Sequence, residues 1–156
     1  MSASLVKRIV AAVGAAAALG AAAPGVAQAD HTNALALCNQ KYSGGNFTHY
    51  GRVPIQTDNG SAIGWVALAY RGAAGNNVQW CAVTVRRYHA EARYTSVRIK
   101  RESDADWRDD SGQFFEYAGP VMRALDYGTA GQCLVVRGQI TDEIVAFRIC
   151  NNVVEV

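Results

Sequence analysis

Four carboxylates crowd into the stretch between residues 104 and 110 and could, by residue type, bind a metal ion. They belong to Asp104, Asp106, Asp109 and Asp110. Calcium prefers such hard oxygen ligands, but the spacing does not fit an EF-hand loop, because Arg108 takes an early ligand position in either possible frame. Charged runs are more often solvated turns. We therefore favour a turn whose acids face the basic residues at 98–101, and we expect no metal site.

Three tryptophans could bind a carbohydrate. Trp65, Trp80 and Trp107 are the tryptophans of the chain, and a flat aromatic ring can stack on a sugar only where it is exposed. Aromatic side chains in a small domain are more often buried. The sequence leaves both interpretations open, and the solvent exposure of the three rings distinguishes them.

A basic stretch between residues 86 and 101 interleaves arginine and lysine with tyrosine and histidine. Such a composition can contact an anionic polymer. The chain has 15 Lys and Arg against 13 Asp and Glu, but Lys7 and Arg8 fall in an N-terminal export signal that contains no acid. The rest is formally neutral, which argues against nucleic-acid binding, since that needs a basic excess. A polar sheet face is the favoured interpretation, and anionic-polymer binding is the alternative.

Residues suited to catalysis are sparse. The histidines are His31, His49 and His89, and no Gly-x-Ser-x-Gly motif presents a nucleophilic serine. The cysteines are expected to be oxidised and therefore unreactive. Because no motif with a mechanism is present, we expect neither an enzyme nor a cofactor.

The N-terminal 29 residues have the three parts of a secretory signal peptide. Lys7 and Arg8 supply a positive region, an uncharged alanine-rich stretch follows at 9–23, and Ala-Gln-Ala at 27–29 matches a cleavage site. The apolar stretch is shorter and less apolar than the ~20 residues of a membrane span. We expect cleavage before Asp30, secretion, no membrane association afterwards, and a single mature domain at 30–156.

All four cysteines, Cys38, Cys81, Cys133 and Cys150, lie in the expected mature domain. An even number in an exported chain predicts two disulfides, for which three pairings are possible. Two strand-like segments flank a two-residue turn at Thr141-Asp142, which would place Cys133 opposite Cys150 and within disulfide reach. Cys38 then pairs with Cys81 by elimination. A zinc site is the competing interpretation, although the chain lacks a Cys-x-x-Cys pair and a histidine at ligand spacing.

Strands must position these residues, because the recurring hydrophobic period is two. The expected strands lie at 65–70, 79–86, 94–100, 113–117, 121–125, 132–137 and 144–150. The segment 94–100 alternates as a half-buried strand with a polar face, and one short helix is expected at 32–40. Short strands separated by Gly, Asn and Asp turns indicate an all-β fold, either a small antiparallel β-sandwich or a barrel.

The stretch 112–121, GQFFEYAGPV, has three aromatic residues in four positions. If 113–117 is one strand, Phe115 and Tyr117 share a face, and one face should lie in the core. Gly119 and Pro120 then mark a turn at 118–120. A core strand followed by a turn is the favoured interpretation, and a ligand-contacting platform is the alternative.

Several motifs of the chain are shared with a known family. They are Cys38 followed by Lys41-Tyr42, Cys-Ala-Val-Thr-Val-Arg at 81–86, Trp107 with Asp-Ser-Gly-Gln-Phe at 110–114, Tyr-Ala-Gly-Pro-Val at 117–121, and Ala-Gly-Gln-Cys at 130–133. Together they resemble the spore-associated protein A family of small secreted actinobacterial proteins over most of residues 38–150. After the third cysteine the chain departs from that pattern, with Leu-Val-Val-Arg-Gly in place of the usual tryptophan and glycine pair. The resemblance implies export and association with the spore or cell surface, without enzyme chemistry.

We therefore expect a secreted, disulfide-stabilised structural protein without catalytic activity. Its expected partner is the spore or cell-wall surface. The alternative is an extracellular binding module for a cell-wall glycan or another anionic polymer.

Overall fold

The computed structural model describes residues 31–44, 46–72, 77–126, 132–151 and 153–156. In these residues a helix precedes nine strands: α1 (His31–Lys41), β1 (Thr48–Gln56), β2 (Ala62–Arg71), β3 (Asn77–Arg86), β4 (Arg93–Arg101), β5 (Arg108–Phe114), β6 (Tyr117–Asp126), β7 (Cys133–Ile140), β8 (Glu143–Cys150) and β9 (Val153–Glu155). The predicted signal at 1–29 and the predicted mature terminus Asp30 lie outside the described residues. Within the described part of the chain, no helix has the length and apolar character needed to cross a membrane.

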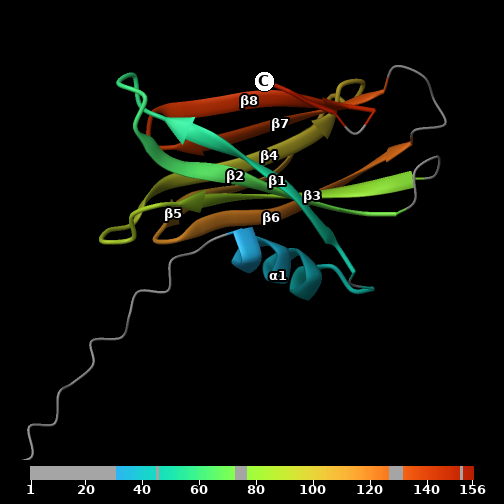
Figure 1. Cartoon of the computed structure of the whole chain (residues 1–156), viewed down its shortest axis with the longest axis horizontal. Coiled ribbons are helices and arrows are strands. Elements are labelled where there is room, and N and C mark those ends of the chain that lie inside the picture. The colour runs from blue at the N-terminus through green and yellow to red at the C-terminus, as the bar shows by residue number, and fades with distance from the viewer. Residues whose placement is uncertain (1–30, 45, 73–76, 127–131, 152) are drawn as a thin grey trace, which may run out of the picture.

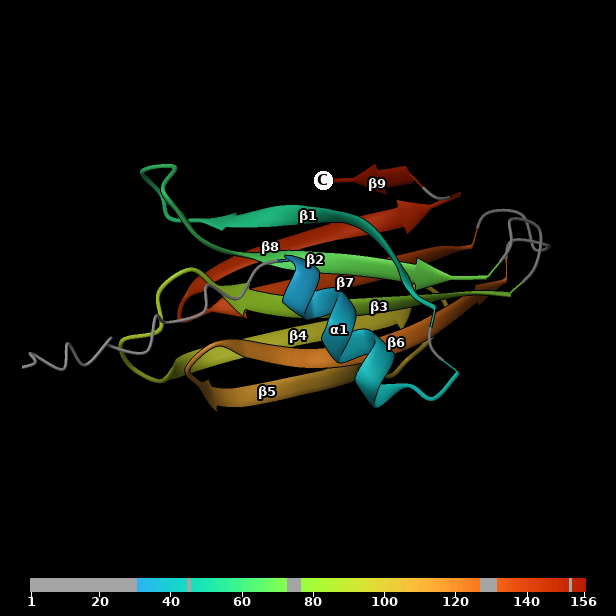
Figure 2. The same cartoon turned by 60° about the horizontal axis from the view of Figure 1, so that its bottom comes forward.

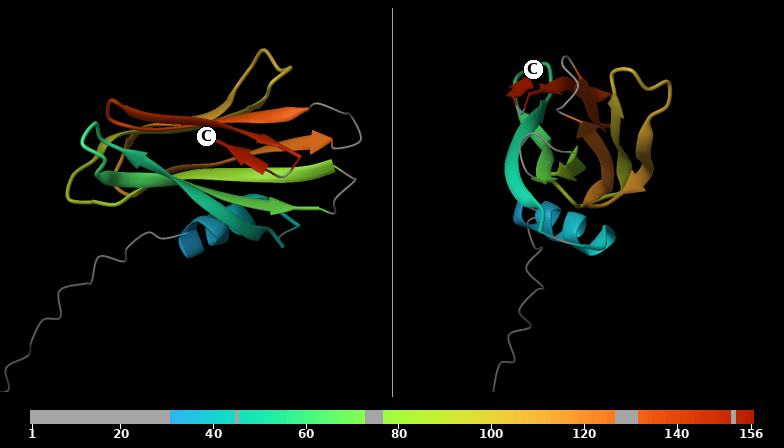
Figure 3. Two further views of the ribbon diagram at one scale, coloured as in Figure 1. Left: turned by 45° about the horizontal axis from the view of Figure 1, so that its top comes forward. Right: turned by 90° about the vertical axis from the view of Figure 1, so that its right-hand side faces the viewer.

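The strands form two antiparallel sheets that face one another. Sheet A has the strand order β1-β2-β3-β6, and sheet B has the order β5-β4-β7-β8-β9. Figure 1 shows the sheets stacked, with α1 outside sheet A, and the end-on view in Figure 3 shows both sheets curving around a shared interior. Trp80 and Leu68 of sheet A meet Ile99, Leu134 and Ile149 of sheet B in the core. The predicted all-β fold is confirmed, and of the two expected forms, sandwich or barrel, the chain adopts the sandwich.

Two predicted hairpins are confirmed together with the disulfides. β2 pairs with β3, and β7 pairs with β8 across a turn at Thr141 and Asp142. Cys133 lies directly opposite Cys150, and a disulfide joins them across a Cα–Cα distance of 4.5 Å. The second disulfide joins Cys38 to Cys81. Because both pairs are oxidised and no cysteine of the described residues is free, the zinc interpretation is excluded.

The central strands β2 and β3 of sheet A are buried on both faces, which explains why their sequences are nearly continuous apolar runs. In β3, Trp80 and Ala82 face sheet B, whereas Cys81 and Val83 face the helix. Figure 2 shows α1 lying across the outer face of this sheet. The disulfide from Cys38 fixes the helix there, close to the predicted range 32–40.

The prediction of one strand at 113–117 is wrong. β5 ends at Phe114, a turn follows, and β6 begins at Tyr117. Phe115 lies in the turn with 58% of its surface exposed, so it does not enter the core. A long-range contact holds the turn, because the Arg86 guanidinium donates to the carbonyl oxygens of Phe114 and Phe115.

The expected turn at 118–120 lies instead inside β6. Gly119 has a φ of +107°, which favours glycine, and the pairing of β6 with β3 is irregular at this point. Pro120 lacks a backbone N–H and is tolerated where the ladder is interrupted. The two residues thus form an irregularity within a strand rather than its end.

The edges of the sandwich carry two strands that the hydrophobic period does not indicate. β1 contains Gly51 and Pro54, which weaken the strand signal but are tolerated at an edge. β9 pairs with β8 at the edge of sheet B. On β4, Val97 and Ile99 face the core as predicted, whereas Ser96 on the expected polar face is 1% exposed.

Candidate functional site: a basic groove

The three predicted ligand-contacting tryptophans lie in separate places. Trp80 is fully buried between the sheets, so the prediction that it contacts a surface ligand is corrected. Trp65 is half-buried on the outer face of sheet A, with the Arg52 guanidinium 5.3 Å from its ring. Trp107 is half-buried before β5, with Lys100 Nζ 5.2 Å from its ring. The chain therefore does not combine its tryptophans in one stacking surface.

The acidic cluster is divided between a turn and a strand, and two of its carboxylates bind inside the fold. Asp104 Oδ2 accepts hydrogen bonds from the Arg101 N–H at 3.0 Å and from the Arg123 guanidinium. Asp110 Oδ2 accepts one from the Gly119 N–H at 2.7 Å. The turn interpretation predicts acids that face residues 98–101; Asp104 does accept from the Arg101 backbone, but its ion pair is with Arg123 of β6, outside that run. In the part of the chain that the structure describes, no three His, Cys, Asp or Glu side chains are grouped to hold a metal.

The ionisation of Asp104 is favoured by these contacts. Burial of the carboxyl raises its pKa, but hydrogen bonds from the Arg101 N–H and the Arg123 guanidinium, together with the charges of both arginines, outweigh burial. The net result is a lowered pKa for Asp104. The carboxylate is therefore a stable anionic support for Arg123.

The basic stretch at 86–101 does not form one surface. Arg86 ends β3 and is 3% exposed, whereas Arg101 ends β4 at the opposite end of the sandwich. The nine residues of β4 separate the two groups. Only the Arg101 end contributes to a basic surface groove.

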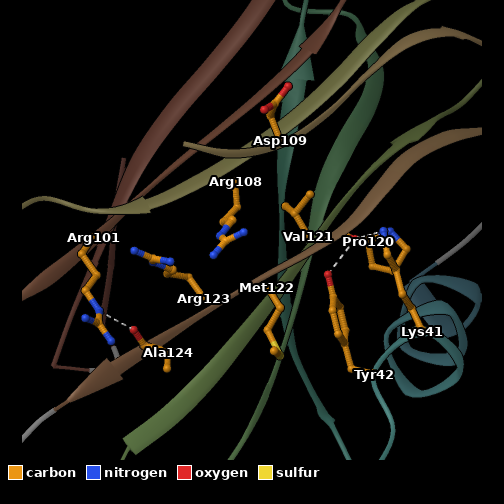
Figure 4. A pocket seen from close by; sticks show the side chains of 10 residues that line it. All are labelled: Lys41, Tyr42, Arg101, Arg108, Asp109, Pro120, Val121, Met122, Arg123 and Ala124. Atoms are coloured by element: carbon orange, nitrogen blue, oxygen red, sulfur yellow. Dashed lines mark hydrogen bonds between the residues drawn. The ribbon is translucent and has the colours of Figure 1, made fainter. Parts of the chain in front are cut away.

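The groove lies along β6, between β5 and the C-terminal end of α1, and has a volume of about 430 Å³. The cations that line it come from four elements: Lys41 from α1, Arg101 from β4, Arg108 from β5 and Arg123 from β6. Asp109 is the acid in the lining. We call the side formed by Lys41 and Tyr42 the helix rim and the side formed by Arg101, Arg108 and Arg123 the strand rim. Figure 4 shows the side chains of both rims, with Lys41 and Tyr42 turned toward Pro120. We call this site the basic groove.

The helix rim is held by one backbone carbonyl. Lys41 Nζ and the Tyr42 hydroxyl donate to Pro120 O at 2.9 and 3.0 Å. Burial raises the pKa of the Tyr42 hydroxyl, the Arg108 charge opposes this effect, and the Asp110 charge adds to it. Tyr42 therefore stays protonated and keeps donating at neutral pH.

The strand rim contains two fixed cations and one without a partner. Arg101 Nε donates to Ala124 O at 2.8 Å, and Arg123 pairs with Asp104. The Arg108 side chain is exposed and makes no hydrogen bond or ion pair to any described residue. In Figure 4 its side chain extends from β5 toward β6, between Arg123 and Val121. Arg108 is thus the cation best placed to meet an anion from solvent.

Sequence reasoning missed the groove because its residues are far apart in the chain. Lys41 and Arg123 meet at β6 only because α1 is tied to β3 and β3 pairs with β6. The expected Cys38–Cys81 disulfide was the available signal, since it places the end of the helix near sheet A. The sequence did not predict that β6 pairs with β3 and so completes sheet A beside the helix.

The histidines do not assemble a catalytic group in the described residues. His89 Nε2 lies 2.6 Å from the backbone oxygen of Arg86. His49 lies on β1, which β2 separates from β3, the strand that precedes His89. The side chain of His31 lies outside the described residues.

Comparison with known proteins does not place the chain in a family. No family model, no curated protein and no solved structure matches it. The resemblance to the spore-associated protein A family thus stays a prediction from the sequence motifs.

Proposed function

We propose that this chain is a secreted, non-catalytic protein of the spore or cell surface that attaches to an anionic wall polymer through the basic groove. The observation that carries the proposal is Arg108, whose exposed side chain has no hydrogen bond or ion pair to the described residues and lies in a groove with three other cations. A guanidinium in this position suits phosphate or carboxylate groups.

The charge balance of the groove supports an anionic ligand. Asp109 and the Asp104 carboxylate that pairs with Arg123 are outnumbered by the four cations. A cleft lined mainly by one sign of charge attracts the opposite charge. Because the groove is open at the surface, a chain of repeating anionic groups suits it better than an enclosed small molecule does.

The disulfides support action outside the cell. Cys38–Cys81 and Cys133–Cys150 are compatible with an extracellular location, because disulfides persist in oxidising compartments. The motif resemblance to secreted spore-associated proteins points in the same direction. A cross-linked domain with a binding groove on its surface suits a protein that remains bound to a surface.

A neutral wall glycan is the weaker candidate. Stacking on sugar rings would need an exposed aromatic surface, but Trp80 is buried, and a cation lies near each of Trp65 and Trp107. The observed arrangement favours charge recognition over stacking.

Sedimentation with purified bacterial cell walls tests the proposal. Walls that retain their phosphate- or carboxylate-bearing polymer should bind the protein, and walls extracted to remove that polymer should not. Arg108→Glu should weaken binding about tenfold or more, because it replaces attraction by repulsion. Arg52→Glu changes the net charge equally on β1, at the far edge of sheet A, and should leave binding nearly unchanged.

Salt provides the second measurement. Binding through exposed charges should weaken as ionic strength rises. The proposal fails if extracted and intact walls bind equally, or if Arg108→Glu and Arg52→Glu reduce binding to the same extent.

A further inference from the structure

A second pocket lies at the opposite end of the sandwich, where β3 ends and β4 begins. It has a volume of about 230 Å³ and is lined by residues of the loop after β3 and by Ile63 of β2 and Ile140 of β7. In Figure 1 this is the end at which β8 follows β7. It is separate from the basic groove and shares no lining residue with it. We call it the Arg86 pocket.

The central feature of this pocket is a buried arginine without an acidic partner. Arg86 is 3% exposed, and its Nη1 donates to the carbonyl oxygens of Glu91, Phe114 and Phe115 at 2.6, 2.6 and 3.0 Å. No carboxylate of the described residues forms an ion pair with it. None of the hydrogen bonds among the described residues uses its Nε or Nη2 donors.

A buried charge of this kind is costly unless an opposite charge compensates it. Burial lowers the pKa of Arg86, the neighbouring Arg93 charge lowers it further, and the Glu91 charge only partly opposes both. The carbonyl oxygens satisfy one nitrogen but carry no formal charge. The Nε and Nη2 donors of the guanidinium can therefore bind an anion.

The walls of the pocket restrict what that anion can be. Ile63, Ile140 and Ala90 offer apolar surface, and Tyr88 offers an aromatic ring at the rim, where it is 61% exposed. Glu91 pairs with Arg93, so Arg86 is the one uncompensated charge in the lining. A single positive charge beside apolar walls matches a monoanion with an apolar body.

We propose that the Arg86 pocket binds a small organic carboxylate that carries an apolar group of about the size of one ring. The carboxylate accepts from the free donors of Arg86, and the apolar group packs against Ile63 and Ile140. This site adds a small-molecule ligand to the proposed polymer-binding function and does not depend on it.

Titration of the intact domain with phenylacetate, followed by NMR amide shifts and by calorimetry, tests this proposal. A ligand of about ten non-hydrogen atoms in a matching pocket should bind with millimolar affinity or better. The largest shifts are expected at residues 86–93 and at Ile63 and Ile140. Phenylacetamide, which has the same shape without the charge, should bind at least about tenfold more weakly.

Two variants separate ligand binding from a purely structural role of Arg86. Arg86→Gln should lower phenylacetate affinity about tenfold or more, but it also removes contacts to the β5–β6 turn. Ala90→Trp fills the pocket from an exposed loop position without changing Arg86, and it should lower affinity to a similar extent. Ala105→Trp, an exposed alanine in the turn between β4 and β5, is the matched control and should keep the affinity.

Several outcomes overturn the proposal. Equal affinity for phenylacetate and phenylacetamide would remove the role of the charge. Unchanged affinity in Ala90→Trp would place the ligand elsewhere, and absence of saturable binding at about 10 mM would show that Arg86 serves only the β5–β6 turn. Unchanged affinity in Arg108→Glu, by contrast, is expected, because that residue belongs to the basic groove.

Discussion

At the scale of single residues, Asp104 links the acidic turn to the basic groove. Its carboxylate accepts from the Arg101 backbone and from the Arg123 side chain, while Lys100 Nζ donates to its carbonyl oxygen at 3.2 Å. One acid therefore orders the turn between β4 and β5 and also holds a cation of the groove. The same residue, read from the sequence alone, was a candidate calcium ligand.

The lowered pKa of Asp104 leads to a pH-dependent contribution to stability. Because the folded pKa lies below the unfolded value, the contribution is complete above the ordinary aspartate pKa of about 3.9 and is lost as the pH falls through the lowered folded value. Asp104→Ala should destabilise the fold by about 1 kcal/mol at neutral pH. Urea unfolding of both proteins across pH measures this difference.

The difference between the wild type and Asp104→Ala should shrink toward zero in acid. Asp106→Ala is the control, since Asp106 is exposed in the same turn and forms no ion pair with a described residue; it should change stability little at any pH. A difference for Asp104→Ala that did not shrink as the pH fell from neutrality into strong acid would contradict the assigned role.

The type of a residue does not reveal whether its side chain is exposed to solvent in the fold. Trp80 occupies a strand that is buried on both faces, so neither of its possible orientations exposes the ring. The sequence, in contrast, presents Arg108 only as a residue that interrupts a calcium-binding motif. Its availability depends on which partners the fold brings near, and the local sequence contains no such information.

At the scale of elements, the two sheets lie close together at Gly138 of β7. A Cβ atom at this position would lie 2.2 Å from Val66 Cγ2 and 2.9 Å from Thr84 Oγ1, both in sheet A. Such contacts are shorter than packed side chains allow. Gly138 therefore lets β7 lie against β2 and β3.

Gly138→Ala should destabilise the domain by about 1–3 kcal/mol, because the added methyl group overpacks the core. Gly51→Ala is the matched control: Gly51 also lies in a strand, but nothing lies within 4 Å of its Cβ position, so the substitution should be neutral or slightly stabilising. Thermal or urea unfolding compares the two. Equal effects would contradict close sheet contact at Gly138.

Element prediction succeeded where the local pattern and the tertiary environment agree. The β7–β8 hairpin combines alternation, a two-residue turn and two cysteines at opposed positions, and all three indicate the same register. The stretch GQFFEYAGPV lacks that agreement. Its Gly-Pro pair resembles a turn, yet the chain turns at Phe115, where Arg86 from β3 binds the carbonyl oxygens.

At the scale of the whole molecule, the two disulfides connect different parts of the fold. Cys133–Cys150 closes a short loop of sequence separation 17 within one hairpin of sheet B. Cys38–Cys81 spans a separation of 43 and joins α1 to the outer face of sheet A. Only the second link holds an element that otherwise contacts the sandwich through one packed face and a few side-chain hydrogen bonds.

Removing the disulfides in pairs should therefore have unequal effects on stability. In the chain-entropy model, Cys38→Ala/Cys81→Ala should cost about 4 kcal/mol and Cys133→Ala/Cys150→Ala about 3 kcal/mol, because the first closes the longer loop. Urea unfolding gives both values. A larger loss for the short-loop pair would contradict the entropic account.

The same variants connect the fold with the basic groove. α1 carries Lys41 and Tyr42, which form the helix rim by binding Pro120 O. When the Cys38–Cys81 link is absent, α1 should dissociate more often, so its amides should exchange faster with solvent and cell-wall binding should weaken. Loss of Cys133–Cys150 leaves both rims in place and should preserve binding wherever the domain stays folded. If both double variants bind walls equally well while α1 exchanges faster in only one, the helix rim does not contribute to the groove.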